Sequence, residues 1–367
     1  MPKRKTEIEA APARQPAQAP KPFVGQERIV DYFRQLGPEG LAQAYVFSGP
    51  RGTGKRSFAR ALALTLHCER PTSFPLGYCG TCGPCVRGIA GSSGDTIVVD
   101  AEFIHRADAQ ADTTPRKTDD MGIEAARAVL REMQLRSYEG GRMVCIIPDF
   151  ENVTGDVVYN ALLKELEEPD AGKLFLITVE RPESVLPTVR SRSVELRFAP
   201  LAESAIAGQL ETHYGVKKAR ARTLARRAQG SLGTALEELD DEVAALRASA
   251  RAWALDCLRS PQEMPATPQL SKEDREAARA DLDEIIRQAR IAVRDVIAYS
   301  AAGDAYVLDV ELLPEVKRTA AALKDAATAL SAAALAALDE ASRLASTNVA
   351  PGQILGWLQI QLRSLRV

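Results

Sequence analysis

The chain has 367 residues, of which 46% are hydrophobic and 26% are charged, and its formal net charge is -2. This length exceeds what one compact core holds and is typical of two or three globular domains. The near-neutral charge excludes a chain that grips nucleic acid along its whole length, so any contact with DNA must be local or shared with partners.

The N-terminal segment, residues 1–22, is rich in Ala, Pro, Lys and Arg and lacks hydrophobic periodicity. Because such a segment cannot bury enough surface to offset its conformational entropy, we expect a disordered tail. It contains no apolar run of the signal-peptide type, and no stretch of the chain reaches the roughly 18 apolar residues of a membrane span. We therefore expect a cytoplasmic protein. In that compartment, six cysteines favour a metal site over a disulfide framework.

From Phe23 to about Pro200, short apolar runs alternate with helical patterns. Continuous apolar runs of this length are typical of strands in a parallel sheet that helices cover on both faces. The expected strands are 45–47, 97–99, 144–147 and 174–177. The expected helices between them are 56–66, 123–135 and 157–166. The sequence therefore predicts a doubly wound α/β domain over residues 23–200.

A glycine-rich segment follows the first expected strand and precedes a helical pattern. It reads Gly49-Pro50-Arg51-Gly52-Thr53-Gly54-Lys55. In such a segment Gly49, Gly52 and Gly54 let backbone N–H groups wrap phosphates, the following helix adds its dipole, and Lys55 reaches the terminal phosphates. This order of strand, loop, lysine and helix predicts a Walker A loop.

Two features of an active ATPase are missing. Arg56 stands where a Ser or Thr hydroxyl would bind magnesium, and Ser57 lies about 100° further around the helix. After the strand 144–147 the chain reads Pro148-Asp149-Phe150-Glu151, which lacks the adjacent Asp-Glu pair that holds magnesium and orients the attacking water. The two acids either serve catalysis or cap the loop after the strand. The sequence favours a chain that does not hydrolyse ATP and leaves open whether the loop still holds it.

Four cysteines form the second distinctive pattern, Cys68 followed by Cys79, Cys82 and Cys85. Turn-forming glycines and a proline lie among the last three, so four thiolates can converge on one point, as in a closed structural zinc site. His67, next to the first cysteine, is not needed as a ligand. The alternative, four unpaired core cysteines, agrees poorly with these polar, turn-rich neighbours.

After Pro200 the strand signals stop, and helical patterns are punctuated by Gly215, Gly230 and Gly233. These patterns predict a small helical domain over residues 201–245. The remaining residues, 246–367, are also helical in pattern apart from a Pro-rich linker at 260–271, and they predict a third, all-helical domain.

A Walker A loop followed within one helix by a four-cysteine module resembles the clamp-loader branch of AAA+ proteins, which comprises the gamma/tau and delta prime subunits of bacterial DNA polymerase III. Three further segments resemble this family: Val24-Gly25-Gln26, the segment 160–169, and Ser191-Arg192-Ser193, in which Ser193 replaces the usual cysteine. The resemblance runs from about Phe23 to Leu236. It implies an AAA+ domain with an inserted zinc module at 68–85, a helical lid at 201–245 and a helical collar at 246–367.

Within the branch, gamma-type subunits hydrolyse ATP and resemble one another in an intact Asp-Glu pair and an arginine in a Gly-Ser-Leu-Arg motif. Here that motif reads Gly230-Ser231-Leu232-Gly233. The departures at Arg56, Pro148 and Gly233 therefore resemble the delta prime type.

The resemblance implies a subunit that joins gamma/tau and delta subunits in an assembly that opens the beta clamp and places it on primed DNA, without a membrane partner. This chain would act as a stator and would supply Arg192 as an arginine finger to a neighbour's ATP. Arg190, Arg192 and Arg197 also fit a solvated edge of the domain. The alternative functions are a gamma/tau-like ATPase with a tolerant site and, more distantly, an AAA+ helicase loader.

Overall fold

The computed structural model of the chain describes residues 23–111, 121–138, 141–153, 158–159, 165, 172–259, 264–272 and 275–365. The expected disordered tail, most of the expected helix at 157–166, most of the family segment 160–169 and part of the linker at 260–271 lie outside the described residues. The chain divides into two compact units. The first comprises Met1–Ser48 and Lys55–Arg197, and the second comprises Gly49–Gly54 and Phe198–Val367.

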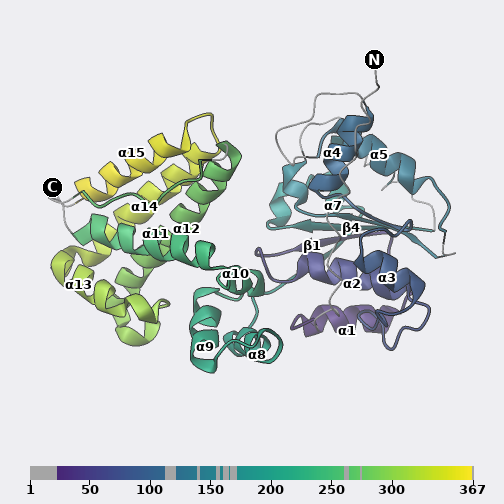
Figure 1. Cartoon of the computed structure of the whole chain (residues 1–367), viewed down its shortest axis with the longest axis horizontal. Helices are drawn as coiled ribbons and strands as arrows, with labels where there is room; N and C mark the ends of the chain where they lie inside the picture. The colour runs from purple at the N-terminus through teal and green to yellow at the C-terminus, as the bar shows by residue number, and fades with distance from the viewer. Residues whose placement is uncertain are drawn as a thin grey trace, which may run out of the picture. The chain divides into compact units, whose positions relative to one another are not determined.

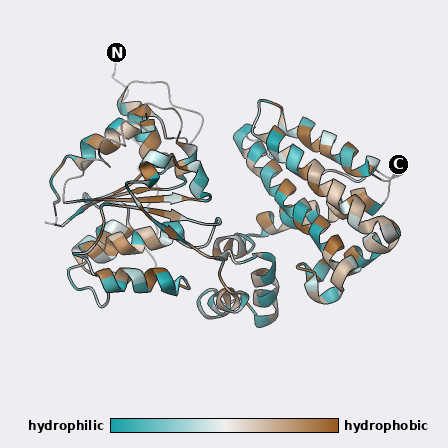
Figure 2. Ribbon diagram, turned by 180° about the vertical axis from the view of Figure 1, so that it is seen from behind, coloured by the Kyte–Doolittle hydropathy of each residue, from teal (hydrophilic) through white to brown (hydrophobic). Residues whose placement is uncertain are grey.

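The first unit is built on a five-stranded sheet with the order β2-β3-β4-β1-β5, in which every pair of neighbours is parallel. The strands are β1 (Ala44–Ser48), β2 (Thr96–Val98), β3 (Met143–Ile147), β4 (Lys173–Val179) and β5 (Val194–Arg197). All residues of β1, β3 and β4 are buried. Figure 2 shows the mainly hydrophobic colour of these strands.

Helices cover both faces of this sheet (Figure 1). One face carries α1 (Glu27–Leu36), α2 (Lys55–His67) and α3 (Gly83–Ile89), and the other carries α4 (Ala101–Gln110) and α5 (Ile123–Met133). The alternation of side chains along β1 produces these two layers. Tyr45 and Phe47 join an aromatic cluster with Phe33 and Phe58, whereas Val46 belongs to the core on the opposite face.

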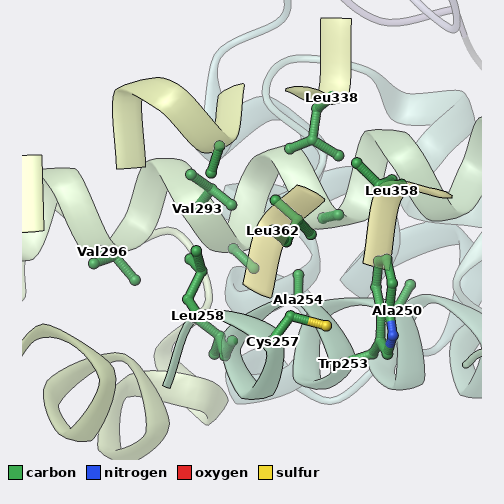
Figure 3. Close-up of a cluster of buried hydrophobic side chains, with 14 of the residues drawn as sticks. Ala250, Trp253, Ala254, Cys257, Leu258, Val293, Val296, Leu338, Leu358 and Leu362 are labelled. Carbon is green, nitrogen blue, oxygen red and sulfur yellow. The ribbon is translucent and has the colours of Figure 1, made fainter. Parts of the chain in front are cut away.

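The second unit is entirely helical in its described part after Phe198. Its first helices are α8 (Glu203–Tyr214), α9 (Lys218–Arg227) and α10 (Leu232–Glu237), which share a small hydrophobic core. A larger core joins α11 (Asp241–Arg259), α12 (Arg275–Ala302), α13 (Leu313–Leu323), α14 (Ala327–Ala345) and α15 (Pro351–Ser364). Figure 3 shows Trp253, Leu258, Val293, Leu338 and Leu358 packed together in this core.

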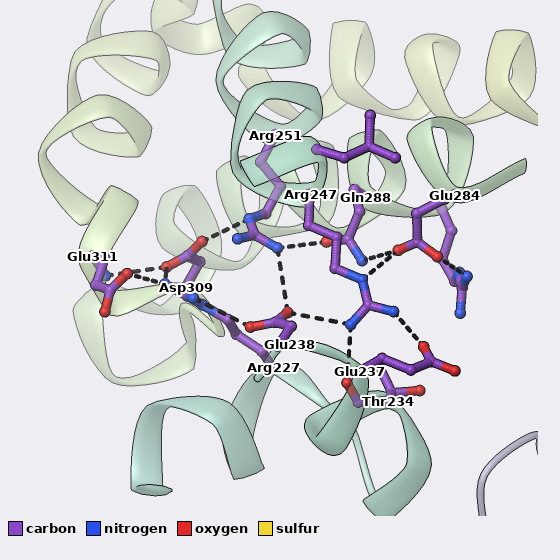
Figure 4. A network of polar contacts seen from close by, with 12 residues as sticks. Arg227, Thr234, Glu237, Glu238, Arg247, Arg251, Glu284, Gln288, Asp309 and Glu311 are labelled. Carbon is purple, nitrogen blue, oxygen red and sulfur yellow. Dashed lines mark hydrogen bonds and ion pairs between the residues drawn. The ribbon is translucent and has the colours of Figure 1, made fainter. Parts of the chain in front are cut away.

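Buried ion pairs connect α9 and α10 with α11, α12 and the turn that contains Asp309 (Figure 4). Arg227 donates to Asp309 at 2.6 Å, and the Nε of Arg251 lies 2.9 Å from the same carboxylate. Arg247, which is 1% exposed, donates to Glu284 at 2.7 Å. Glu238 lies within 4 Å of all three arginines. These charges fix the first helices of the unit to the larger bundle.

The expected parallel α/β sheet and the all-helical C-terminal region are confirmed. The strand β5 and the helices α1, α3 and α4 are additions to the expected elements. The division of the helical region into 201–245 and 246–367 stays a prediction. Among the described helices, none by itself is long and apolar enough to span a membrane, although the bent pair Val310–Leu323 and Ala327–Ala345 meets that criterion jointly.

Candidate metal centre and phosphate-binding loop

The four cysteines of the predicted metal site come together in the first unit. Cys68 directly follows α2, Cys79 lies in the loop after it, Cys82 precedes α3, and Cys85 belongs to the first turn of α3. Their sulfur atoms all lie within 4.8 Å of one another. Four sulfurs bound to one tetrahedral ion at about 2.3 Å lie about 3.8 Å apart, so this set fits a metal ion with small adjustments.

The surroundings of the sulfur atoms favour thiolates. The backbone N–H of Cys79 donates to the sulfur of Cys68 at 3.2 Å, and the N–H of Cys82 donates to the sulfur of Cys79 at 3.3 Å. Hydrogen bonds from the backbone of Thr81 and Cys82 lower the pKa of Cys79 to about 5. Burial, in contrast, raises the pKa of Cys85, whose side chain is fully enclosed. A bound cation would offset that burial because it stabilises the thiolate.

His67 is engaged outside this cluster. Its Nε2 lies 2.8 Å from the carbonyl oxygen of Arg142, and its Nδ1 lies 3.2 Å from the hydroxyl of Thr96. Both ring nitrogens therefore serve the packing of α2 against the sheet. Cys145 and Cys257 are buried in the two hydrophobic cores, where they pack as small core residues.

The glycine-rich loop joins the end of β1 to the start of α2, as expected for a phosphate-binding loop. The φ angle of Gly52 is 73°, in the left-handed region that favours glycine. The hydroxyl of Thr53 donates to the carbonyl oxygen of Pro50 at 2.8 Å and closes the turn. Lys55 begins α2 and is 5% exposed. The loop thus has the placement between strand and helix and the buried lysine that a Walker A motif requires, and its binding of nucleotide stays a prediction.

The position after Lys55 is occupied by a cation. Arg56 is exposed, and its guanidinium lies 3.7 Å from the carboxylate of Asp100 at the start of α4. Arg60, one turn further along α2, lies 3.8 Å from the same carboxylate. Ser57 is exposed as well. The sequence did not indicate Asp100 as the partner of Arg56, because that ion pair depends on where α4 begins.

Acidic groups at the carboxyl ends of β3 and β4 act on Lys55. Burial lowers the pKa of Lys55, and the charges of Glu180, Asp149 and Glu151 oppose that effect. The side chain of Asp149 makes no capping hydrogen bond, and its backbone has a φ of 48°. Glu151 accepts a hydrogen bond of 2.9 Å from the N–H of Glu180, so the two strand ends are joined. At least one of the two acids therefore has a structural partner.

Arg192 follows the short helix α7 (Pro187–Arg190) and precedes β5. Its guanidinium donates to the carbonyl oxygen of Thr188 at 3.0 Å and lies on the surface. β1 and β5 are parallel, with Ser48 opposite Arg197. The amino end of β5 therefore lies beside the start of β1 and away from the end of β1, where the glycine-rich loop begins. The first and last residues of this four-residue strand are three rises of about 3.3 Å apart, which separates the two ends by roughly 10 Å. Arg192 and Lys55 thus lie toward opposite ends of the parallel strands β1 and β5.

The neighbouring arginines differ from Arg192 in their contacts. Arg190 pairs with Glu195 at 3.2 Å, and Glu195 also accepts a hydrogen bond of 3.1 Å from Ser48 at the end of β1. Arg197, the last residue of β5, is exposed. Arg190 therefore has a structural role, whereas Arg192 and Arg197 are exposed on the surface.

The chain is similar in sequence to subunits of DNA polymerase III. Residues 25–202 match the family described as DNA polymerase III, delta subunit. The chain is 34% identical over 177 residues to DNA polymerase III subunit gamma/tau of Mycobacterium tuberculosis, which covers 48% of this chain and 28% of that relative. It is 32% identical over 227 residues to DNA polymerase III subunit tau of Escherichia coli, which covers 60% of this chain and 32% of that relative.

A third relative carries a different subunit name. The chain is 34% identical over 154 residues to DNA polymerase III subunit delta' of Pseudomonas aeruginosa, which covers 42% of each protein. The chain thus spans less than half the length of each of these three curated relatives.

Proposed function

Because residues 25–202 match the family described as DNA polymerase III, delta subunit, we propose that this chain is a subunit of the assembly that loads the beta sliding clamp onto primed DNA during replication. The similarity to proteins named subunit delta', subunit tau and subunit gamma/tau supports this proposal. The partners are then gamma/tau and delta subunits, with the clamp and primed DNA reached through the complex. A replication subunit works beside the chromosome, so the location is the cytoplasm.

Within that assembly the chain is a stator of the delta prime type, which does not hydrolyse ATP. The ion pair between Arg56 and Asp100 carries this part of the proposal. A guanidinium stands where the magnesium ligand is needed, and the adjacent Asp-Glu pair is absent. Without magnesium and an oriented water, phosphoryl transfer loses its main electrostatic stabilisation.

Arg192 is the arginine finger that this stator supplies to a neighbouring subunit. Arg192 lies at the other end of the parallel strands from Lys55 and is exposed, and both features favour an action in trans. A guanidinium offered to a neighbour's γ-phosphate stabilises charge in the transition state.

The cysteine cluster holds one structural zinc ion in the AAA+ domain. Thiolates suit zinc, and four of them leave no coordination position for catalysis. The helices of the second unit provide the lid and the collar through which the chain joins its partners.

A gamma/tau-like ATPase is the second candidate. The intact glycines and Lys55 of the loop favour it, and so does the match to the tau relative over 60% of this chain. ATP turnover by the isolated chain distinguishes this motor from the stator.

Co-purification tests the assembly itself. The full chain with an affinity tag, produced together with gamma/tau and delta subunits, is expected to bring both of them through size-exclusion chromatography in a fixed ratio. Elution of the chain by itself, while the other two subunits are present and folded, would contradict the proposal.

A further inference from the structure

The phosphate-binding loop is in close contact with the start of α10, inside the second unit. The backbone N–H of Gly233 donates to the carbonyl oxygen of Gly52 at 3.1 Å. A Cβ atom at position 233 would lie 3.0 Å from the Cα of Gly52, and a Cβ at position 52 would lie 2.1 Å from the hydroxyl oxygen of Ser231. The two backbones approach this closely only because both residues are glycines.

Ser231 is held in place on its own side of the contact. Its hydroxyl oxygen accepts a hydrogen bond of 3.0 Å from the N–H of Thr234 and thereby caps α10. It also lies 2.8 Å from the hydroxyl of Thr234, and the residue is 7% exposed. Ser231 cannot turn away from Gly52 without losing this cap.

An ion pair ties the loop to the same helix. Arg51 lies 3.3 Å from one carboxylate oxygen of Glu237, at the end of α10. The other oxygen of Glu237 accepts a hydrogen bond from Arg247. Arg247 donates to the carbonyl oxygen of Thr234 at 2.9 Å and to Glu284 of α12 (Figure 4). The helix that contacts the loop is thus anchored to α11 and α12 by a buried arginine.

We propose that the segment Ser231 to Glu237 is a latch that holds the loop in a form closed to nucleotide. Phosphate oxygens need room beside the loop backbone, because each N–H···O hydrogen bond spans about 2.9 Å. On the side of Gly52 where a Cβ would stand, that room is taken by the hydroxyl of Ser231 and the backbone of Gly233. Binding of a nucleoside triphosphate therefore requires release of the latch, and the two states exclude each other.

The latch assigns a specific reason to the glycine at position 233. Any side chain there meets the Cα of Gly52, so the closed form tolerates no residue with a Cβ without a shift of the loop. The glycine thus does more than omit a charged side chain, since it allows α10 to close on the loop. This inference concerns nucleotide binding by the isolated chain, and it stands whether or not the chain joins a clamp-loading assembly.

Titration of the full chain with a fluorescent ATP analogue in the presence of magnesium tests the latch. Gly233→Ala adds one methyl group at the contact with Gly52. Arg51→Ala removes the more exposed partner of the ion pair with Glu237. Gly208→Ala, on α8 in the same unit, is the matched control because no atom lies within 4 Å of its Cβ position. Circular dichroism and tryptophan fluorescence verify that each variant is folded.

We expect weak binding by the natural chain, and an affinity about tenfold higher for Gly233→Ala, as for a site freed from a closed form that is populated about nine times in ten. We expect a gain of about two- to fivefold for Arg51→Ala, because exposed ion pairs contribute little, and no change for Gly208→Ala. If Gly233→Ala does not fold, the affinity of Arg51→Ala for the ATP analogue decides whether the latch exists. Unchanged affinity in the folded variants, or absence of binding in all of them, would overturn the latch. Co-purification with the other subunits tests the proposed function separately.

Discussion

Replacement of Asp309 by asparagine tests whether the buried ion pairs stabilise the second unit. The Asp309 side chain is 2% exposed and contacts two buried guanidinium groups, those of Arg227 at 2.6 Å and Arg251 at 2.9 Å. It also accepts a hydrogen bond of 3.1 Å from the N–H of Glu311. Asparagine keeps the shape but removes the charge. Because one carboxylate oxygen of Asp309 faces Arg227 and the other faces Arg251, the NH₂ group of asparagine would face an arginine donor in either orientation.

The expected loss of stability is large. Removal of one partner from a buried ion pair costs about 3–5 kcal/mol, because the remaining charge stays buried without compensation. Glu238 remains as a second carboxylate near both arginines and keeps the loss at the lower end of that range, near 3 kcal/mol. With a urea dependence of about 1–3 kcal/mol per molar, the unfolding midpoint should fall by about 1 M or more.

Tryptophan fluorescence reports selectively on the unfolding of the second unit. The two tryptophans of the chain, Trp253 and Trp357, lie in α11 and α15, so both report on the second unit. Asp339→Asn is the matched control, because Asp339 is 68% exposed and pairs with Arg290 on the same bundle. An exposed pair contributes at most about 1 kcal/mol. A loss for Asp309→Asn no larger than that of the control would refute the view that the buried charges hold α9 to the bundle.

The cysteine cluster, the glycine-rich loop and Arg192 each support one further prediction. Metal analysis of protein purified without chelator should find about one zinc ion per chain, and Cys85→Ser should lower both the zinc content and the melting temperature; a zinc content near zero would contradict the structural site. The isolated chain should hydrolyse ATP far more slowly than about 1 per second, the lower end for ordinary enzymes, and turnover in that range would favour the gamma/tau-like motor. In a reconstituted loader, Arg192→Ala should reduce clamp-stimulated ATP hydrolysis by about a thousandfold per site that it serves, whereas Arg197→Ala should leave it unchanged. Equal rates for Arg192→Ala and the natural chain would exclude the finger.

The sequence was informative where a local pattern has one structural outcome. The buried strands β1, β3 and β4 are built around continuous apolar runs, which are typical of a sheet covered on both faces. The cysteine spacing, with its turn-forming neighbours, likewise brings the four thiols together. In contrast, β5 alternates between half-buried and exposed residues at the sheet edge, and four residues are too few for that alternation to stand out.

Contacts between distant segments could not be predicted from the sequence. The approach of Gly233 to Gly52 depends on how the helical unit folds back on the loop, and neither glycine carries a signal of it. The spacing of the buried arginines, in contrast, is visible in the sequence. Arg247 and Arg251 lie four residues apart on α11, on the side that also buries Ala250 and Ala254. Charged residues at such spacing within a buried face indicate a buried ion-pair network rather than a solvated surface.

Clamp loading with purified components tests most directly whether this chain is a subunit of the loader. Gamma/tau and delta subunits, the beta clamp, primed DNA and ATP are combined with or without this chain, and the amount of clamp retained on the DNA is measured. We expect efficient loading only when the chain is present, with all ATP hydrolysis attributable to the gamma/tau subunits. Equal loading in the absence of the chain would contradict its role as a subunit of the loader.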